Sequence, residues 1–153
     1  MRLLVTGGDG FLGWHLRTRL HSLSNHDVVS VDVDNWSEIE RLAHHADALV
    51  HLAGVNRASD TEVEQGNIRL AVDVARAVQS APKPPRVVYA NSVQAGNDTP
   101  YGRGKSEAGS ILETACASAG SQFANVLLPN LFGEYGRPNY NSFVATFVDK
   151  VVR

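Results

Sequence analysis

Residues 6–13 read TGGDGFLG, and this stretch decides the fold. The apolar segment before it has the pattern of a β-strand, and the residues after it have helical spacing. Gly7, Gly10 and Gly13 permit a tight turn and a close approach of the backbone to a ligand. Asp32 ends a second strand pattern about 20 residues further on, where a carboxylate can accept hydrogen bonds from ribose hydroxyls. The combination predicts a dinucleotide site, with the pyrophosphate at the helix N-terminus.

The composition is that of one globular domain and excludes several classes of partner. The chain has 153 residues, 43% of them apolar, and a formal net charge of −2 with no basic run. This charge argues against nucleic acid or an anionic membrane surface as a partner. No uninterrupted apolar stretch is long enough to predict a membrane span. Cys116 is the single cysteine, which fits a reducing compartment and predicts a cytoplasmic location. No cluster of Cys and His has zinc spacing, so no metal site is expected.

Strand and helix patterns alternate along the whole chain, which predicts a Rossmann-like α/β fold with a doubly wound parallel sheet covered on both faces. Strands are expected at residues 2–6, 27–32, 48–53, 86–91 and 124–128, and helices at residues 11–22, 37–45, 64–80, 101–119 and 141–152. Ser37 is the candidate N-cap of the second helix. The carboxyl ends of parallel strands meet at one edge of the sheet, so the glycine turn, Asp32, Gly54, Ser92 and Pro129 should lie together there.

The last predicted helix has a broad apolar stripe that includes Phe143, Phe147 and Val151. A single domain, residues 1–153, would expose this stripe, and such patches usually have a partner. We therefore expect either that the natural protein continues beyond Arg153 or that another subunit covers this face. On this interpretation the sequence is truncated at its C-terminal side, and a substrate-capping region and any second domain are absent from it.

Tyr101 and Lys105 form a Tyr-x-x-x-Lys motif, in which both side chains lie on the same side of a helix. A lysine cation beside a tyrosine favours the phenolate and is expected to lower its pKa from about 10. Such a tyrosine can exchange a proton with a substrate oxygen, and Ser92 at the end of the preceding strand can orient the same oxygen. Each residue alone is more often a surface or capping residue; their order after the glycine turn and Asp32 favours catalysis.

Together these segments resemble the extended short-chain dehydrogenases/reductases, the NAD-dependent epimerase/dehydratase family that acts on nucleotide sugars. The resemblance covers the whole chain: residues 6–13 are similar to the family's TGxxGFxG, residues 51–54 to its HLAG, and residues 130–133 to its N-x-Y-G. It implies that Ser92, Tyr101 and Lys105 are catalytic. It implies that Ser92, Asn130 and Asn141 bind the substrate. The cofactor-binding residues it implies, together with the glycine turn, are Gly7, Gly10, Phe11, Leu12, Gly13, Asp32, Leu52, Ala53, Gly54, Asn67, Tyr101, Lys105 and Pro129.

A narrower resemblance is to the N-terminal reductase domain of capsular polysaccharide enzymes of the CapF type. It rests on residues 54–57 (GVNR), 92–95 (SVQA), 129–133 (PNLFG) and 137–142 (RPNYNS). The resemblance implies reduction of the 4-keto group of a UDP-2-acetamido-2,6-dideoxy-hexos-4-ulose, on the route to UDP-N-acetyl-L-fucosamine. It also implies a separate C-terminal domain that acts at C3.

Two questions stay open from the sequence. The resemblance implies NADPH for the CapF type, whereas the carboxylate of Asp32 favours NAD because it repels a 2′-phosphate. The segment between Asp32 and His51 is also shorter than in most family members, so the usual loop around the adenine is missing.

Alternative functions are a nucleotide-sugar 4-epimerase or dehydratase that retains NAD, and a non-catalytic dinucleotide-binding sensor or scaffold. The family resemblance implies a homodimer formed through the helices at residues 64–80 and 101–119.

Overall fold

The computed structural model describes residues 1–140 and 142–152. Its strands are β1 (Arg2–Thr6), β2 (Asp27–Val31), β3 (Ala48–His51), β4 (Arg86–Ser92) and β5 (Phe123–Leu128). Its α-helices are α1 (Phe11–Leu23), α2 (Ile39–Ala43), α3 (Asp60–Ser80), α4 (Pro100–Ser118) and α5 (Phe143–Val152). Two 3₁₀ helices are η1 (Val33–Glu38) and η2 (Val93–Gly96).

The sheet has the order β2-β1-β3-β4-β5, and every neighbouring pair is parallel. The chain passes from β1 to β2 on one side and then crosses to β3 on the other side of β1. This reversal creates the switch point at which open α/β sheets bind ligands. The predicted doubly wound parallel sheet of five strands is therefore confirmed.

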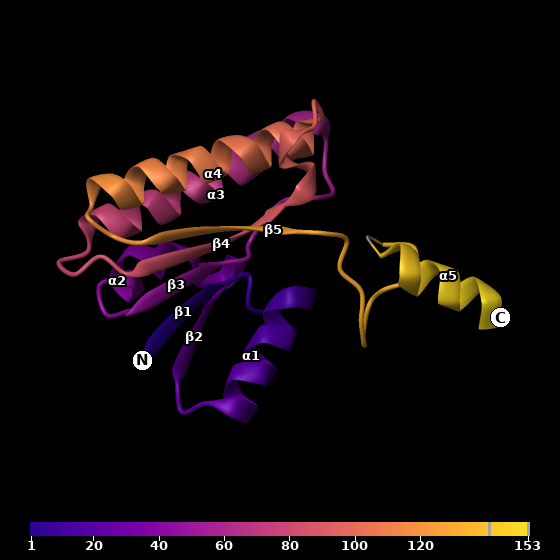
Figure 1. Cartoon of the computed structure of the whole chain (residues 1–153), viewed down its shortest axis with the longest axis horizontal. Coiled ribbons are helices and arrows are strands. Elements are labelled where there is room, and N and C mark those ends of the chain that lie inside the picture. Colours follow the sequence, from indigo (N-terminus) through magenta and orange to yellow (C-terminus); the bar gives the residue numbers. More distant parts are fainter. Residues whose placement is uncertain (141, 153) are drawn as a thin grey trace.

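Helices lie on both faces of the sheet, but they cover the two faces unequally (Figure 1). Helices α3 and α4 lie side by side on one face, and α2 packs beside α3. Leu49, Val87 and Tyr89 point into this layer and are buried together with Val74 and Leu112 of the helices. Within the described residues, α1 is the one helix on the opposite face, near β1 and β2. The expected covering of both faces is therefore complete only on the side of α3 and α4.

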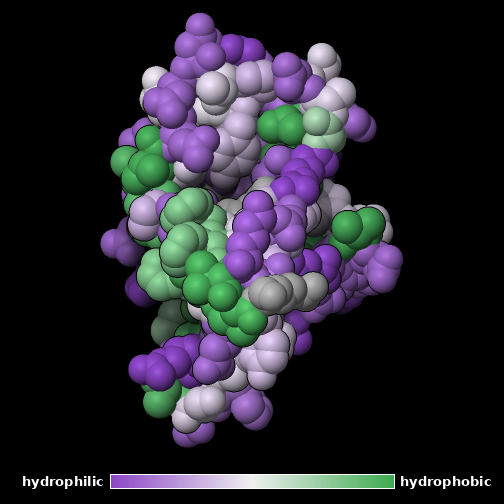
Figure 2. All heavy atoms as spheres, turned by 90° about the vertical axis from the view of Figure 1, so that its right-hand side faces the viewer, coloured by the Kyte–Doolittle hydropathy of each residue, from purple (hydrophilic) through white to green (hydrophobic). Residues whose placement is uncertain are grey.

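Helix α5 stands apart from the sheet (Figure 1), and its large apolar side chains are exposed. Phe143 and Phe147 are 75% and 57% exposed, and Val126 of the edge strand β5 is 40% exposed. Figure 2 looks at this end of the molecule and shows apolar side chains gathered on its surface. The predicted exposure of the last helix is confirmed.

Several element boundaries differ from the sequence-based prediction because side chains cap the chain elsewhere. The expected helix at residues 37–45 is η1 followed by the short α2, and Ser37 is not its N-cap: Asp32 caps η1 reciprocally with Asn35. Ser59 and Thr99 cap α3 and α4, each accepting a backbone N–H, so both helices begin before the predicted residues. No helix within residues 1–140 and 142–152 is both long enough and apolar enough to cross a membrane.

Candidate active site

The glycine turn joins β1 to α1 at the carboxyl edge of the sheet. Gly7 has φ +67°, and a Cβ there would lie 2.8 Å from the backbone N of Ala53. A Cβ on Gly13 would lie 2.2 Å from the carbonyl oxygen of Gly7. Gly10 donates its N–H to that same oxygen at 3.1 Å and then serves as the N-cap of α1. The turn is therefore packed too closely against the segment after β3 and against itself for side chains at Gly7 and Gly13.

The first turn of α1 has N–H groups that are available to an anion beside the glycine turn. The first N–H groups of an α-helix have no intrahelical partner, and the N-cap Gly10 has no side chain to occupy them. Phe11, Leu12 and Gly13 lie in this first turn. Their position fits the pyrophosphate of a dinucleotide, because backbone N–H groups and the helix dipole both favour negative charge there.

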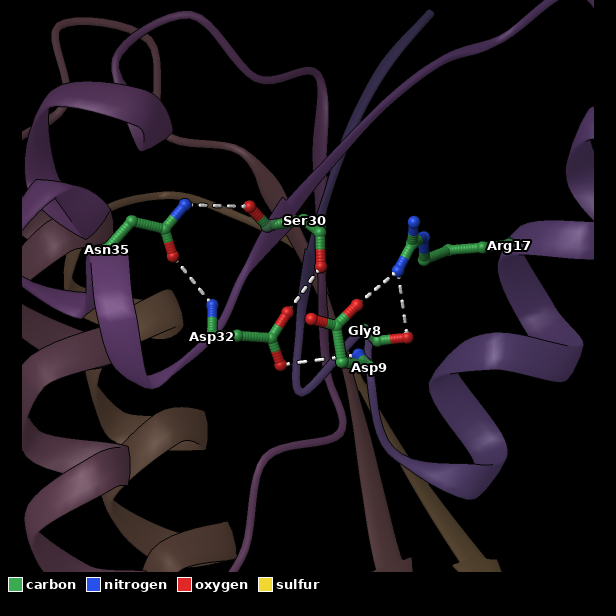
Figure 3. A network of polar contacts seen from close by, with 6 residues as sticks. All are labelled: Gly8, Asp9, Arg17, Ser30, Asp32 and Asn35. Carbon is green, nitrogen blue, oxygen red and sulfur yellow. Dashed lines mark hydrogen bonds and ion pairs between the residues drawn. The ribbon is translucent and has the colours of Figure 1, made fainter.

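Asp32 lies directly after β2, beside the glycine turn (Figure 3). Its Oδ2 accepts a hydrogen bond from Ser30 Oγ at 2.6 Å, and its Oδ1 accepts one from the backbone N–H of Asp9 at 3.3 Å. Asn35 fixes the backbone from the other side: its Oδ1 accepts the N–H of Asp32, and its Nδ2 donates to the carbonyl of Ser30. The carboxylate is thus held where an adenosine ribose is expected.

The segment after β3 is fastened to β1 by Thr6. Its Oγ1 accepts the backbone N–H groups of Leu52 and Ala53, both at 3.2 Å, so its own proton is available to Nδ1 of His51 at 2.7 Å. Burial lowers the pKa of His51 to about 3, and the charge of Lys105 adds to this shift. His51 is therefore neutral and accepts the proton of Thr6. Leu52 and Ala53 lie against Gly7 of the glycine turn, while the contact of Leu52, Ala53 and Gly54 with a cofactor stays a prediction.

Asn67 uses its amide to shape the same loop. Its Nδ2 donates to the carbonyl oxygens of Val55 and Val63, both at 2.7 Å, and its Oδ1 accepts the N–H of Val55 at 3.3 Å. The side chain is buried, at 2% exposure. These contacts give Asn67 a role in placing the loop after β3, while its contact with a cofactor stays a prediction.

Ser92 and Tyr101 meet at the carboxyl end of β4. Ser92 ends this strand and its hydroxyl accepts the N–H of Gln94 at 3.1 Å. Tyr101 lies in the first turn of α4, which Pro100 begins. Burial raises the pKa of Tyr101, and its interaction with the side chain of Ser92 opposes part of that rise. The two side chains predicted to share a substrate oxygen are therefore brought together.

Lys105 is buried one turn further along α4, at 4% exposure. Its Nζ donates to the carbonyl oxygen of Ala90 at 2.7 Å and lies 4.1 Å from the ring centroid of Tyr89. Burial lowers the pKa of Lys105 to about 7. The expected lowering of the Tyr101 pKa is wrong for this structure, because burial raises that pKa. The Nζ of Lys105 is directed to Ala90 and Tyr89.

The residues after β5 extend along the same edge. Pro129 and Asn130 follow the last residue of β5 directly and are exposed. Asn141, the third predicted substrate residue, lies outside the described residues. The sheet thus places Pro129 and Asn130 at the predicted edge.

The segment after them folds back onto α1. The side chain of His15 makes a hydrogen bond at 3.0 Å to the carbonyl of Glu134, and the rings of Trp14 and Tyr135 meet edge to face, with centroids 4.9 Å apart. These contacts place residues 134–135 against His15 and Trp14 of α1, the helix that follows the glycine turn.

A second long-range contact joins the loop after β3 to the segment after β5. Arg57 donates to the carbonyl oxygens of Asn139 and Tyr140, and its guanidinium lies 4.3 Å from the Tyr140 ring centroid. The contact joins residues more than 80 positions apart, so no local sequence signal could have found it. Thr6 was also missed, although a polar residue ending a buried strand just before the glycine turn is a usable signal.

The described part of the chain holds no group of three or more His, Cys, Asp or Glu side chains placed to bind a metal ion. The glycine turn, the open helix N-terminus and Asp32 fit the pyrophosphate and ribose of NAD(P). Ser92, Tyr101 and Lys105 lie at the ends of neighbouring elements on the same edge.

Comparison with known proteins finds relatives whose sequences and folds are similar to those of this chain. Residues 3–153 match the NAD dependent epimerase/dehydratase family. The chain is 36% identical to a UDP-2-acetamido-2,6-beta-L-arabino-hexul-4-ose reductase from Pseudomonas aeruginosa, over 100% of this chain and 42% of that protein. The capsular polysaccharide assembling protein CapF from Staphylococcus aureus matches with a TM-score of 0.86 at 35% identity, over 100% of this chain and 42% of that one.

A more distant relative shares the fold alone. The dTDP-glucose 4,6-dehydratase DesIV from Streptomyces venezuelae, solved with NAD, has a TM-score of 0.85 at 19% identity, over 99% of this chain and 62% of its own. The present chain spans less than half the length of the reductase and of CapF.

Proposed function

This chain belongs to the NAD dependent epimerase/dehydratase family, and from that premise we propose that it forms the reductase part of a nucleotide-sugar enzyme. The proposed reaction is reduction of the C4 carbonyl of a UDP-2-acetamido-2,6-dideoxy-hexos-4-ulose. The observation that carries the proposal is the placement of Ser92, Tyr101 and Lys105 at the same sheet edge as the glycine turn and Asp32. The identity to a named ulose reductase supports the substrate class.

The raised pKa of Tyr101 suits the reductive direction. A phenol that is protonated at neutral pH can donate its proton to the C4 oxygen as negative charge develops there. Ser92 is next to Tyr101 and would hold the same oxygen by a hydrogen bond. The nicotinamide, when bound, supplies the hydride. Tyr101 and Ser92 therefore divide proton donation and carbonyl positioning between them.

Lys105 would bind the hydroxyl groups of a cofactor ribose through its Nζ. Its Nζ has one donor directed to Ala90 and carries further N–H groups for ribose hydroxyls. Asp32 would accept hydrogen bonds from the adenosine ribose, which favours NAD over NADP. Asn130 and Asn141 are proposed to contact the nucleotide sugar.

A cytoplasmic location and a homodimer complete the proposal. The described chain has one free cysteine, Cys116, which is buried, and this fits a reducing compartment. Helices α3 and α4 pack together and expose the groove between them that includes Gln79 and Ile111, the face by which we propose that two copies associate.

The proposal is tested by the Tyr101→Phe substitution in the full-length gene product. We expect turnover of the 4-keto sugar nucleotide to fall by about 10²- to 10⁴-fold, because the proton donor is lost. NADH affinity should stay within about twofold, because the ring remains. Tyr135→Phe is the matched control: it removes the hydroxyl of an exposed tyrosine whose ring packs on Trp14.

Each outcome separates the candidate functions. Undiminished turnover in the Tyr101→Phe protein would contradict the catalytic assignment. Tightly retained NAD together with interconversion of C4 epimers would favour the 4-epimerase. Cofactor binding without turnover of any UDP-sugar would favour a sensor or scaffold.

A further inference from the structure

Asp9 and Asp32 lie next to each other at the edge where the adenosine ribose is expected, and Arg17 pairs with Asp9 (Figure 3). Asp9 in the glycine turn donates its backbone N–H to Asp32 at 3.3 Å. The Asp9 side chain in turn holds Arg17 of α1, with Nη1 2.6 Å from Oδ1. The same Nη1 also lies 3.2 Å from the carbonyl oxygen of Gly8. The guanidinium is thus fixed beside the turn by one charge and one backbone oxygen.

This arrangement bears on the choice between NAD and NADP. In dinucleotide folds an acidic residue after the second strand accepts the ribose hydroxyls of NAD, whereas a nearby arginine accommodates the 2′-phosphate of NADP. The present chain has both features, Asp32 and Arg17, within one network. Asp9 occupies the guanidinium, so the arginine is present but engaged.

We propose that the Asp9–Arg17 ion pair is a cofactor-selectivity element, in which Asp9 withholds Arg17 from the 2′-phosphate of NADP. The inference rests on the proposed function and deepens it, because it assigns a second residue beside Asp32 to the rejection of NADP. Asp32 acts by repelling the phosphate, and Asp9 acts by neutralising the cation that would bind it.

The Asp9–Arg17 ion pair contributes little to the stability of the fold. The side chains of Arg17 and Asp9 are 40% and 74% exposed, and exposed ion pairs contribute about 0–1 kcal/mol to stability. Replacing Asp9 therefore leaves the fold intact, and the backbone contact of Arg17 with Gly8 still holds the guanidinium near the turn.

The test is equilibrium titration of NADH and NADPH into the wild-type, Asp9→Asn, Arg17→Met and doubly substituted proteins. Asparagine keeps the shape of Asp9 and removes its charge. We expect Asp9→Asn to tighten NADPH binding by about three- to fivefold, the most that release from an exposed ion pair can supply, as Arg17 becomes free to contact the phosphate. NADH affinity should change by less than about twofold, and the gain should vanish in the double variant.

A control and two probes separate the possible outcomes. Glu113→Gln removes one negative charge from an exposed position on α4 and should leave both affinities unchanged. Displacement by adenosine 2′,5′-bisphosphate, compared with AMP, should follow the NADPH result. A gain that persists without Arg17, or an equal gain for NADH, would overturn the proposal. Equal wild-type affinities for the two cofactors would overturn it and leave the proposed function standing, whereas binding of neither would overturn both.

Discussion

Gly13→Ala is the sharpest test of the glycine turn. Gly13 lies in the first turn of α1, where an added Cβ would lie 2.2 Å from the carbonyl oxygen of Gly7 and 2.6 Å from Cα of Gly8. Ordinary van der Waals contact begins at 3.4 Å, and both opposing atoms belong to the backbone, which cannot rotate away. The substitution therefore forces α1 and the turn apart.

The expected cost follows from this overlap. Overpacking typically costs about 1–3 kcal/mol and sometimes more, and we expect the upper end, about 3 kcal/mol, because no side chain can yield. Gly120→Ala isolates backbone strain, since Gly120 has φ +68° with nothing within 4 Å, and should cost about 1–2 kcal/mol. Gly96→Ala adds a Cβ in open space at an ordinary φ and should change stability by less than about 0.5 kcal/mol.

Urea unfolding followed by circular dichroism measures these stabilities, and NADH titration measures the site. We expect only Gly13→Ala to lose cofactor binding, because it alone moves the N–H groups of the anion site. If the Gly13→Ala protein bound NADH like wild type and unfolded like the Gly96→Ala protein, the close approach of α1 to the turn would be refuted.

Two further predictions concern the buried groups behind the site. The pKa of His51 is lowered by burial from 6.5 to about 3, so between these pH values the unfolded chain binds a proton that the folded chain does not. Stability should fall by up to about 1.4 kcal/mol for each pH unit below 6.5 on account of this residue. Urea unfolding between pH 7.5 and pH 5 should give a flatter profile for His51→Asn and an unchanged one for the exposed His44→Asn. Tyr89→Leu should weaken NADH binding by about 3- to 30-fold, because Lys105 loses the aromatic ring that it lies against. Tyr89→Phe keeps that ring and should bind NADH within about twofold of wild type. Equal losses of affinity in the two variants would exclude a role of the Tyr89 ring in positioning Lys105.

The pKa values of Tyr101 and Lys105 are shifted in opposite directions by their surroundings. The helix places them on neighbouring turns, but the ammonium of Lys105 is directed to Ala90 and Tyr89, and the phenol of Tyr101 is next to Ser92. Burial dominates the pKa of each group, raising that of the phenol and lowering that of the amine. A spacing of four residues predicts that two side chains share a side of a helix, but not which neighbours each one contacts.

The exposed apolar surface of α5 is a second feature that the sequence pattern predicts only in part. The sequence predicted the stripe from its spacing, and the structure leaves Phe143 and Phe147 of α5 exposed, along with the middle residues of strand β5. A stripe shows that a helix has a face to bury, whereas the partner of that face depends on the rest of the fold.

The sequence by itself determined the parallel sheet, the glycine turn and the positions of Asp32, Ser92, Tyr101 and Lys105 on the chain, because these depend on local periodicity and on short fixed spacings. Only the tertiary structure decided what each side chain touches. Thr6 reaches His51, Asp9 engages Arg17 and Arg57 reaches Tyr140 across folded segments, and no local pattern encodes those pairings. The physical reason is that hydrogen bonds, burial and charge depend on distance in space, which the order of residues along the chain does not fix until the sheet has brought its strand ends together.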